Sequence, residues 1–183
     1  MVWSSPLRLR YVVTRESESF RTMDEGVTGI PLSPHPGSFG FARRFHTHEG
    51  IDLYCGDGET VRAVEHGVVV AVLPFTGPKA GSDWWLDTDA ILVEGASGVV
   101  VYGEIRSFVS VGDELRAGEP LGNVTQVLKT DKGRPMTMLH LELHEMGTRD
   151  VYEWSPGGEK PPSLLDPTPH LLAMLENQER LVR

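Results

Sequence analysis

Cysteine is nearly absent from this chain. Cys55 is the one cysteine among 183 residues, so no disulfide can form within the molecule. A chain without disulfides does not need an oxidising compartment to mature. We interpret Cys55 as a buried structural thiol, because free cysteine packs as a small apolar side chain. A role as a soft metal ligand, three residues after Asp52, is the alternative.

Long hydrophobic runs are also missing. Arg8, Arg10 and Arg15 interrupt the N-terminal segment before an apolar stretch of signal-peptide length can develop. No segment approaches the roughly 18 consecutive apolar residues of a transmembrane helix. We therefore expect a soluble, cytoplasmic protein without a membrane partner.

Positive charge is scarce as well. The chain has 17 Lys and Arg against 26 Asp and Glu, which gives a net charge of −9. This balance repels phosphate backbones at long range, so we expect no nucleic-acid partner. The HExxH motif of many zinc peptidases is absent too.

Glycine and proline, in contrast, are abundant. The 20 Gly and 13 Pro predict many turns and few long helices, which favours an all-β, mainly antiparallel fold. Apolar segments between these turns predict strands. From residue 50 onward the strand-like segments are 50–55, 60–73, 90–95, 99–105, 109–124 and 138–145.

The chain is long enough for one compact domain with extensions at both ends. Residues 1–37 are predicted to form an N-terminal arm with one strand at 6–13, and residues 38–175 the main domain. Residues 169–183 are predicted to form a short C-terminal helix and tail, with Thr168 as the N-cap.

Residues 74–89 contain Pro, Gly, Asp and two adjacent Trp residues but no hydrophobic period, which predicts a long loop. Long loops in small domains often lie beside a binding cleft. We interpret Trp84 and Trp85 as side chains that anchor this loop in the core, with a substrate platform as the alternative.

His48 and Asp52 stand four residues apart in the segment HEGID. On an extended chain an even spacing puts both side chains on one face, so an imidazole nitrogen and a carboxylate oxygen could reach the same cation. A chain with seven His forms such a pair by chance often enough that a third ligand is needed.

The segment MLHLELHE alternates strictly between two kinds of side chain. Met138, His140, Glu142 and His144 share one face, and three leucines lie on the other. Polar groups on a buried face need partners, because burial without them is costly. Metal binding and a half-exposed edge strand both account for this pattern.

Together these segments resemble the LytM and lysostaphin-type zinc endopeptidases. The family pattern runs F-G-x-R, H-x-G-x-D, Y-x-H, V-x-x-G-D-x-V-x-x-G-x-x-I-G and H-L-H-F-E. The chain has, in the same order, SFGFARRFHTHEGID, VYGEI, VSVGDELRAGEPLG and MLHLELH, followed by LLDPTPHLL. The match spans roughly residues 38 to 173 and agrees in order, spacing and glycines.

The resemblance implies a mostly antiparallel β-domain with a duplicated hybrid motif and a groove whose floor carries one zinc ion. His48, Asp52 and His140 match the family's metal ligands one by one, and water would take the fourth position. Glu142 is interpreted as a partner that orients a ligand rather than as a ligand itself.

Two positions depart from the family pattern. Glu104 stands at the histidine of Y-x-H, and Met138 stands at the first histidine of H-x-H. In the family these two histidines activate the zinc-bound water and steady the oxyanion. A thioether cannot transfer protons, whereas the carboxylate of Glu104 could serve as a general base.

The other histidines are given lesser roles. His46 and His144 are interpreted as rim or solvent-exposed side chains that could turn toward the site. His35, His66 and His170 lack clustered partners and are assigned no role.

The first hypothesis is a zinc-binding LytM-like protein with reduced or lost peptidase activity, whose groove binds a protein, peptide or cell-wall-like ligand. The alternative is an active zinc hydrolase that uses Glu104 as its base on a peptide or peptidoglycan-type amide. A minor alternative is a biotinyl or lipoyl carrier module, for which Lys79 would be a poor attachment site.

Overall fold

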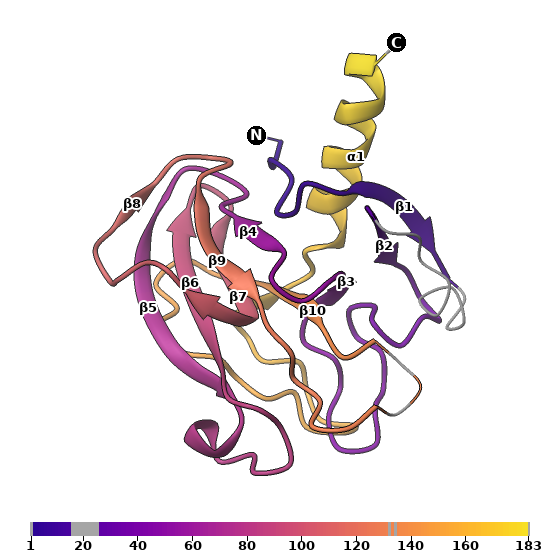
Figure 1. Cartoon of the computed structure of the whole chain (residues 1–183), viewed down its shortest axis with the longest axis vertical. Helices are drawn as coiled ribbons and strands as arrows, with labels where there is room; N and C mark the ends of the chain where they lie inside the picture. Colours follow the sequence, from indigo (N-terminus) through magenta and orange to yellow (C-terminus); the bar gives the residue numbers. More distant parts are fainter. Residues whose placement is uncertain (1, 16–25, 132, 134, 183) are drawn as a thin grey trace.

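The computed structural model describes residues 2–15, 26–131, 133 and 135–182 (Figure 1). Its described elements are mostly antiparallel strands with a helix at the C-terminal end, which confirms the predicted fold class. In chain order they are β1 (Arg10–Thr14), β2 (Val27–Pro31), β3 (Ile51–Tyr54), β4 (Thr60–Arg62), β5 (Gly67–Thr76), η2 (Pro78–Ala80), β6 (Thr88–Gly95), β7 (Gly98–Ser107), β8 (Glu114–Leu115), β9 (Pro120–Val124), β10 (Met138–His144), β11 (Leu164–Leu165) and α1 (Thr168–Val182).

The main sheet has nine strands within the described residues, and its continuous path runs β11-β10-β7-β6-β5-β8. β3 pairs with β10, and β9 pairs with both β4 and β7. In Figure 1 the sheet curves from β5 and β8 on the left to β10 and β3 near the centre. β10 is therefore an interior strand, paired with β3, β7 and β11.

Apolar side chains cover both faces of the central strands. Ile91 and Val93 of β6 belong to the larger hydrophobic cluster, whereas Ala90 and Leu92 belong to the smaller one on the opposite face. Because both faces are buried, β6 has a continuous apolar run rather than an alternating one. This packing gives the strands beside β10 a rigid frame.

The N-terminal segment differs from the predicted arm. It contains two strands in the described residues, β1 and β2, which pair in parallel with Val13 opposite Ile30. Trp3 and Leu7 are buried in the larger hydrophobic cluster, so this segment is part of the domain core. The sequence did not predict β2, because the strand contains Gly and Pro, which are unfavourable in strands. Residues 16–25 of the predicted arm lie outside the described residues.

The C-terminal helix packs onto the same side of the molecule as the N-terminal segment (Figure 1). The ring of His170 stacks on Trp3 with centroids 4.6 Å apart, and Leu171 and Met174 are buried in the core. Asp166 accepts a hydrogen bond from the backbone N–H of Thr168 at 2.8 Å, so the capping oxygen comes from Asp166. No helix in the described part of the chain is long and apolar enough to cross a membrane.

The predicted loop at 74–89 is shorter in the structure, because β5 extends to Thr76 and β6 begins at Thr88. Gly77 lies at φ 88°, and a Cβ there would come within 2.5 Å of the Asp87 backbone. The two ends of the loop therefore approach each other at a glycine, as close backbone contact requires.

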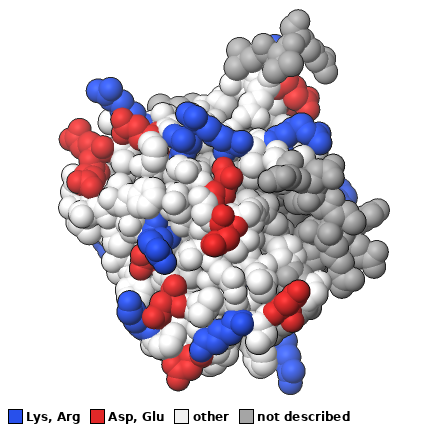
Figure 2. Space-filling model, in the orientation of Figure 1, with Lys and Arg blue, Asp and Glu red and all other residues white. Residues whose placement is uncertain are grey.

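Charged side chains of both signs are mixed on the face of the molecule that Figure 2 shows. Among the described residues on this face, Lys and Arg lie between Asp and Glu, and neither sign forms a large continuous area. The net charge of −9 is therefore not concentrated on this face.

Candidate metal centre

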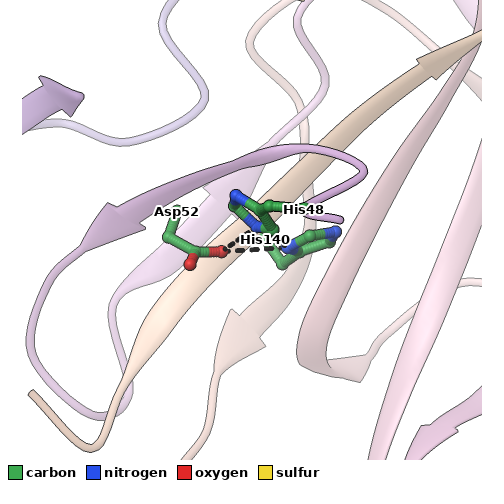
Figure 3. Close-up of side chains that lie close together, drawn as sticks. All are labelled: His48, Asp52 and His140. Atoms are coloured by element: carbon green, nitrogen blue, oxygen red, sulfur yellow. Dashed lines mark hydrogen bonds and ion pairs between the residues drawn. The ribbon is translucent and has the colours of Figure 1, made fainter. Parts of the chain in front are cut away.

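The register of two antiparallel strands brings the candidate ligands together. Asp52 of β3 is paired directly with His140 of β10, so both side chains lie on the same face of the sheet. His48 lies four residues before Asp52, in the segment that leads into β3. Figure 3 shows the three side chains converging on one point from these two segments.

The ligand atoms are almost equidistant. Asp52 Oδ1 lies 3.0 Å from His48 Nε2 and 2.9 Å from His140 Nδ1. The two ring nitrogens are 3.2 Å apart. All three residues are buried, and the donor set of two imidazole nitrogens and one carboxylate oxygen could hold a metal ion.

The atoms of these residues that face away from the cluster also have partners. His48 Nδ1 donates to the carbonyl oxygen of Ser38 at 2.9 Å, which leaves its Nε2 lone pair at the cluster. His140 Nε2 lies 2.9 Å from Glu142 Oε1, and Arg43 Nη2 lies 2.5 Å from Asp52 Oδ2. Such outer partners fix the ring tautomers and orientations of metal ligands.

Burial and charge shift the pKa values of the cluster. Burial would raise the pKa of Asp52, but His48 and Arg43 hold it well below its usual range. Burial lowers the pKa of His48 despite the neighbouring carboxylate. Burial would also lower the pKa of His140, yet hydrogen bonds with Asp52 and Glu142 hold it well above its ordinary value. Asp52 is therefore anionic and His48 neutral, which are the forms that bind metal ions, whereas His140 must release a proton to bind one.

The close packing of β10 explains why position 50, in the segment HEGID, is a glycine. A Cβ at Gly50 would lie 2.5 Å from the carbonyl oxygen of Leu141 and 2.9 Å from His140 Nε2. Any larger residue would push against both the backbone of β10 and the ligand ring. The H-x-G-x-D spacing thus lets β3 approach the strand that carries His140.

Glu142 and His144 continue the polar row of β10 away from the cluster. Glu142 Oε2 lies 2.7 Å from His144 Nε2, and His144 Nδ1 lies 3.2 Å from Ser163 Oγ. Burial would raise the pKa of Glu142, but hydrogen bonds from His140 and His144 lower it to about 2. The prediction that His144 is exposed is wrong: it is fully buried, at a point where β10 pairs with both β7 and β11.

The helper positions of the family lie beside the cluster. Gly103 of β7 is paired with His140, and Glu104 follows it as a half-buried residue at φ 63°. The charge of Glu104 contributes to a raised pKa of Arg43, so the two side chains are within electrostatic range. Met138 is half-buried at the start of β10, opposite Tyr54.

A Cβ on Gly103 would overlap the ring of Phe75, whose centroid lies 5.4 Å from that of His140. Sequence patterns did not indicate this aromatic contact, because Phe75 comes from β5, which is distant in the chain. One side of the His140 ring is therefore covered by an apolar side chain.

The remaining candidate residues are exposed, half-buried or, in the case of Cys55, unreactive. Trp84 is 66% exposed, so its interpretation as a core anchor is wrong, whereas Trp85 is half-buried. His46 is half-buried with Nε2 3.8 Å from Glu49 Oε2. Burial raises the pKa of Cys55 to about 12, which leaves its thiol protonated at neutral pH.

Sequence reasoning missed the role of Arg43 as a partner of Asp52. The residue is visible in the segment FARRF, but a contact across nine positions depends on how the loop before β3 folds back. Ser38 could not be found either, because it contributes a backbone carbonyl, which every residue has.

Comparisons with solved structures find similar chains at low sequence identity. Lysostaphin is 19% identical with a TM-score of 0.49, over 70% of this chain and 44% of its own. Csd3 from Helicobacter pylori is 17% identical with a TM-score of 0.45, over 98% of this chain and 41% of its own. The chain thus spans less than half the length of these two proteins.

A chain of the SpoIIQ-SpoIIIAH pore forming complex is 18% identical with a TM-score of 0.50, over 88% of this chain and 93% of its own. At this identity the likeness shows the fold alone. No curated protein matches the chain significantly in sequence.

The family assignment comes from the sequence. The model of peptidase family M23 matches residues 46–151, more than half of the chain. This stretch contains His48, Asp52 and His140 together with Glu104 and Met138. The match confirms the resemblance to the LytM and lysostaphin type. The chain belongs to peptidase family M23.

Proposed function

We propose that this chain is a zinc-binding M23 domain that retains its metal ligands, has little or no peptidase activity and acts by binding a ligand at the metal. The observation that carries the proposal is the spacing of His48, Asp52 and His140, whose ligand atoms lie 2.9 to 3.2 Å apart. Each of these residues also has an outer partner that orients it.

The donor set fits zinc. Metal–ligand distances of about 2.0–2.2 Å in tetrahedral geometry place neighbouring ligand atoms roughly 3.3–3.6 Å apart. The observed spacing is slightly shorter, so small outward movements of the side chains would accommodate the ion. A bound zinc ion supplies Lewis-acid polarisation of a ligand oxygen. Nickel, cobalt or copper could use the same nitrogen and oxygen ligands.

The helper positions support the loss of activity. Met138 offers a thioether, which neither donates nor accepts protons usefully. Loss of general acid–base assistance typically costs about 10²- to 10⁴-fold in rate. Loss of an oxyanion donor costs about 10²- to 10³-fold. Glu104 carries negative charge where an oxyanion would need a donor, so it does not replace that function.

A second candidate is an active hydrolase with Glu104 as general base. It is favoured by the position of Glu104 directly after Gly103, the residue paired with His140. A carboxylate near a metal centre can accept a proton from a nucleophile. Substrates of this candidate would be peptide or peptidoglycan-type amides.

The first test measures metal binding. The purified protein is stripped with a chelator and titrated with zinc, and we expect one equivalent to bind. His140→Ala should bind much less, while His66→Ala, at an exposed position, should bind as the native chain does. A native protein that stays free of metal after titration would overturn the proposal.

The second test separates the binder from the enzyme. Zinc-loaded protein is incubated with oligoglycine and with cross-linked stem peptides, and both binding and cleavage are followed. Binding without turnover is the expected result. Rapid turnover that is lost in Glu104→Gln and retained in Glu114→Gln, an exposed control, would replace the first candidate with the second.

A further inference from the structure

A continuous row of polar contacts leads from the candidate metal centre into the protein. It starts at His140 Nε2, which lies 2.9 Å from Glu142 Oε1. The other carboxylate oxygen of Glu142 lies 2.7 Å from His144 Nε2, and His144 Nδ1 lies 3.2 Å from Ser163 Oγ. Both oxygens of Glu142 therefore have a donor.

The side chains of this row are buried, so each of them depends on its hydrogen-bond partners. Glu142 is 3% exposed and His144 is fully buried, while Leu141 and Leu143 pack on the opposite face of the strand. Buried polar groups are costly unless every one is hydrogen-bonded, so a fully satisfied row is rigid. A carboxylate held at both oxygens cannot rotate away from the ring that it supports.

We propose that His144 is a positioning residue of the metal centre: it holds Glu142 so that Glu142 fixes the orientation and tautomer of His140. The inference rests on the proposed function, because it concerns the same metal site. It adds a residue that lies outside the family motif and acts on the metal ligands through Glu142.

The proton positions follow from the chemistry of the partners. An ionised carboxylate only accepts hydrogen bonds, so His140 Nε2 and His144 Nε2 must both carry the donated hydrogen. With its hydrogen on Nε2, His140 can present a lone pair on Nδ1 to a metal ion held together with His48 and Asp52. Without the second donor, one oxygen of the buried Glu142 would lose its partner and the carboxylate could turn.

His144 itself is fixed from several sides. Its backbone pairs with Val99 of β7 and with Leu164 of β11. A Cβ on Gly98 would overlap the carbonyl oxygen of His144, so that glycine permits the close packing of β7. The Tyr152 ring lies 6.3 Å from the imidazole. The support for Glu142 is thus built into the sheet.

Ser163 attaches the far end of the row to the segment before β11. Its carbonyl oxygen accepts a hydrogen bond from the backbone N–H of Glu145 at 2.7 Å. Its hydroxyl faces His144 Nδ1, and it can donate to that nitrogen because Nε2 carries the hydrogen. Through this residue the C-terminal segment also contributes to the geometry of the metal centre.

The decisive experiment compares two amides at position 144. A glutamine places its amide nitrogen near the former Nε2 and can still donate to Glu142, whereas an asparagine reaches only toward Ser163. We expect His144→Asn to weaken zinc binding about 10- to 100-fold, the usual effect of losing an outer partner. His144→Gln should restore most of that affinity. His66→Asn is the matched exposed control.

Two further measurements exclude a merely structural role. The free energy of unfolding of each metal-free variant is measured with denaturant, and the Nε2–H proton signal of His140 is followed by NMR. We expect this signal to exchange faster with solvent in His144→Asn than in His144→Gln. Equal zinc affinity in native protein and folded His144→Asn would overturn the inference, as would a glutamine variant as weak as the asparagine one.

Ser163→Ala keeps the inference testable where His144→Asn fails to fold. It removes one hydroxyl, and it should weaken zinc binding less than His144→Asn does and speed exchange of the His140 signal. Unchanged affinity and exchange in this variant would count against the inference. A native chain that binds no zinc would instead overturn the proposed function, so the two failures are distinguishable.

Discussion

The two sides of the candidate metal centre differ sharply. On the ligand side, His48, Asp52 and His140 are at most 6% exposed, contact one another and are each held by an outer partner. On the helper side, Glu104 and Met138 are half-buried and neither carries an imidazole. Under the proposed function, metal binding and proton transfer depend on separate residues, and the chain retains the set for the first alone.

The difference has a simple energetic origin. Metal binding requires a few donor atoms at fixed distances and can persist when neighbouring groups change. Hydrolysis requires in addition that protons and developing charge be managed at defined points in the transition state. Two substitutions on the helper side can thus remove most of the rate while leaving the ligand geometry unchanged.

The largest effect should come from breaking the ligand side. Zinc at 100 times its dissociation constant should stabilise the native chain by about 2.7 kcal/mol, because it binds the folded state. His48→Ala should abolish this stabilisation, since it removes one of three ligands. The free energy of unfolding with zinc and with chelator gives the answer, and His66→Ala should respond as the native chain does. Equal stabilisation of His48→Ala would mean that zinc binds elsewhere.

The next effect should come from rebuilding the helper side. Glu104→His together with Met138→His should raise kcat/KM for a stem-peptide or oligoglycine substrate by roughly 10²- to 10⁴-fold. Position 104 lies at φ 63°, a region in which histidine is several-fold enriched, so the backbone should accept the change.

The same pair in a His140→Ala background should show no gain, because the metal ligand is then missing. If the double variant folds, binds zinc and still fails to cleave, the residues at positions 104 and 138 do not by themselves account for the missing activity. Other parts of the substrate-binding surface must then also differ from those of an active peptidase.

Local pattern indicated which residues could form the ligand side, but not that they meet. HEGID and MLHLELHE each place polar groups on one face of an extended segment, and the fold brings those faces together by pairing Asp52 with His140. The strands and the C-terminal helix were also predictable, because alternation and turn residues are local signals. The family resemblance supplied the pairing that local pattern could not.

The supporting residues could not be predicted, because each depends on contacts distant in sequence. His144 is buried where β10 pairs with both β7 and β11, and the ion pair of Arg43 with Asp52 follows from a loop that folds back. β2 was missed because tertiary pairing with β1 overrides the poor strand propensity of its Gly and Pro.

A smaller effect should come from crowding the ligand side without removing a ligand. Gly50→Ala should destabilise the protein by about 1–3 kcal/mol, because the added methyl overlaps Leu141 and the His140 ring. It should weaken zinc binding through displacement of that ring. Gly56→Ala is the matched control, since a methyl group added there would meet no described atom within 4 Å. Gly50→Ala with native stability and zinc affinity would show that β3 and β10 can separate without cost.

The smallest effect on stability should come from the loop after β5. Trp84 is 66% exposed, so Trp84→Ala should change the free energy of unfolding by at most about 0.5 kcal/mol. Trp85→Ala should cost more, because that side chain is half-buried and its backbone bridges to Leu128. If Trp84→Ala nevertheless weakens the binding of a stem peptide to the zinc-loaded protein, the loop supplies part of the ligand surface. Ligand binding would then involve this loop as well as the three metal ligands, and the loop would belong to the ligand side of the comparison.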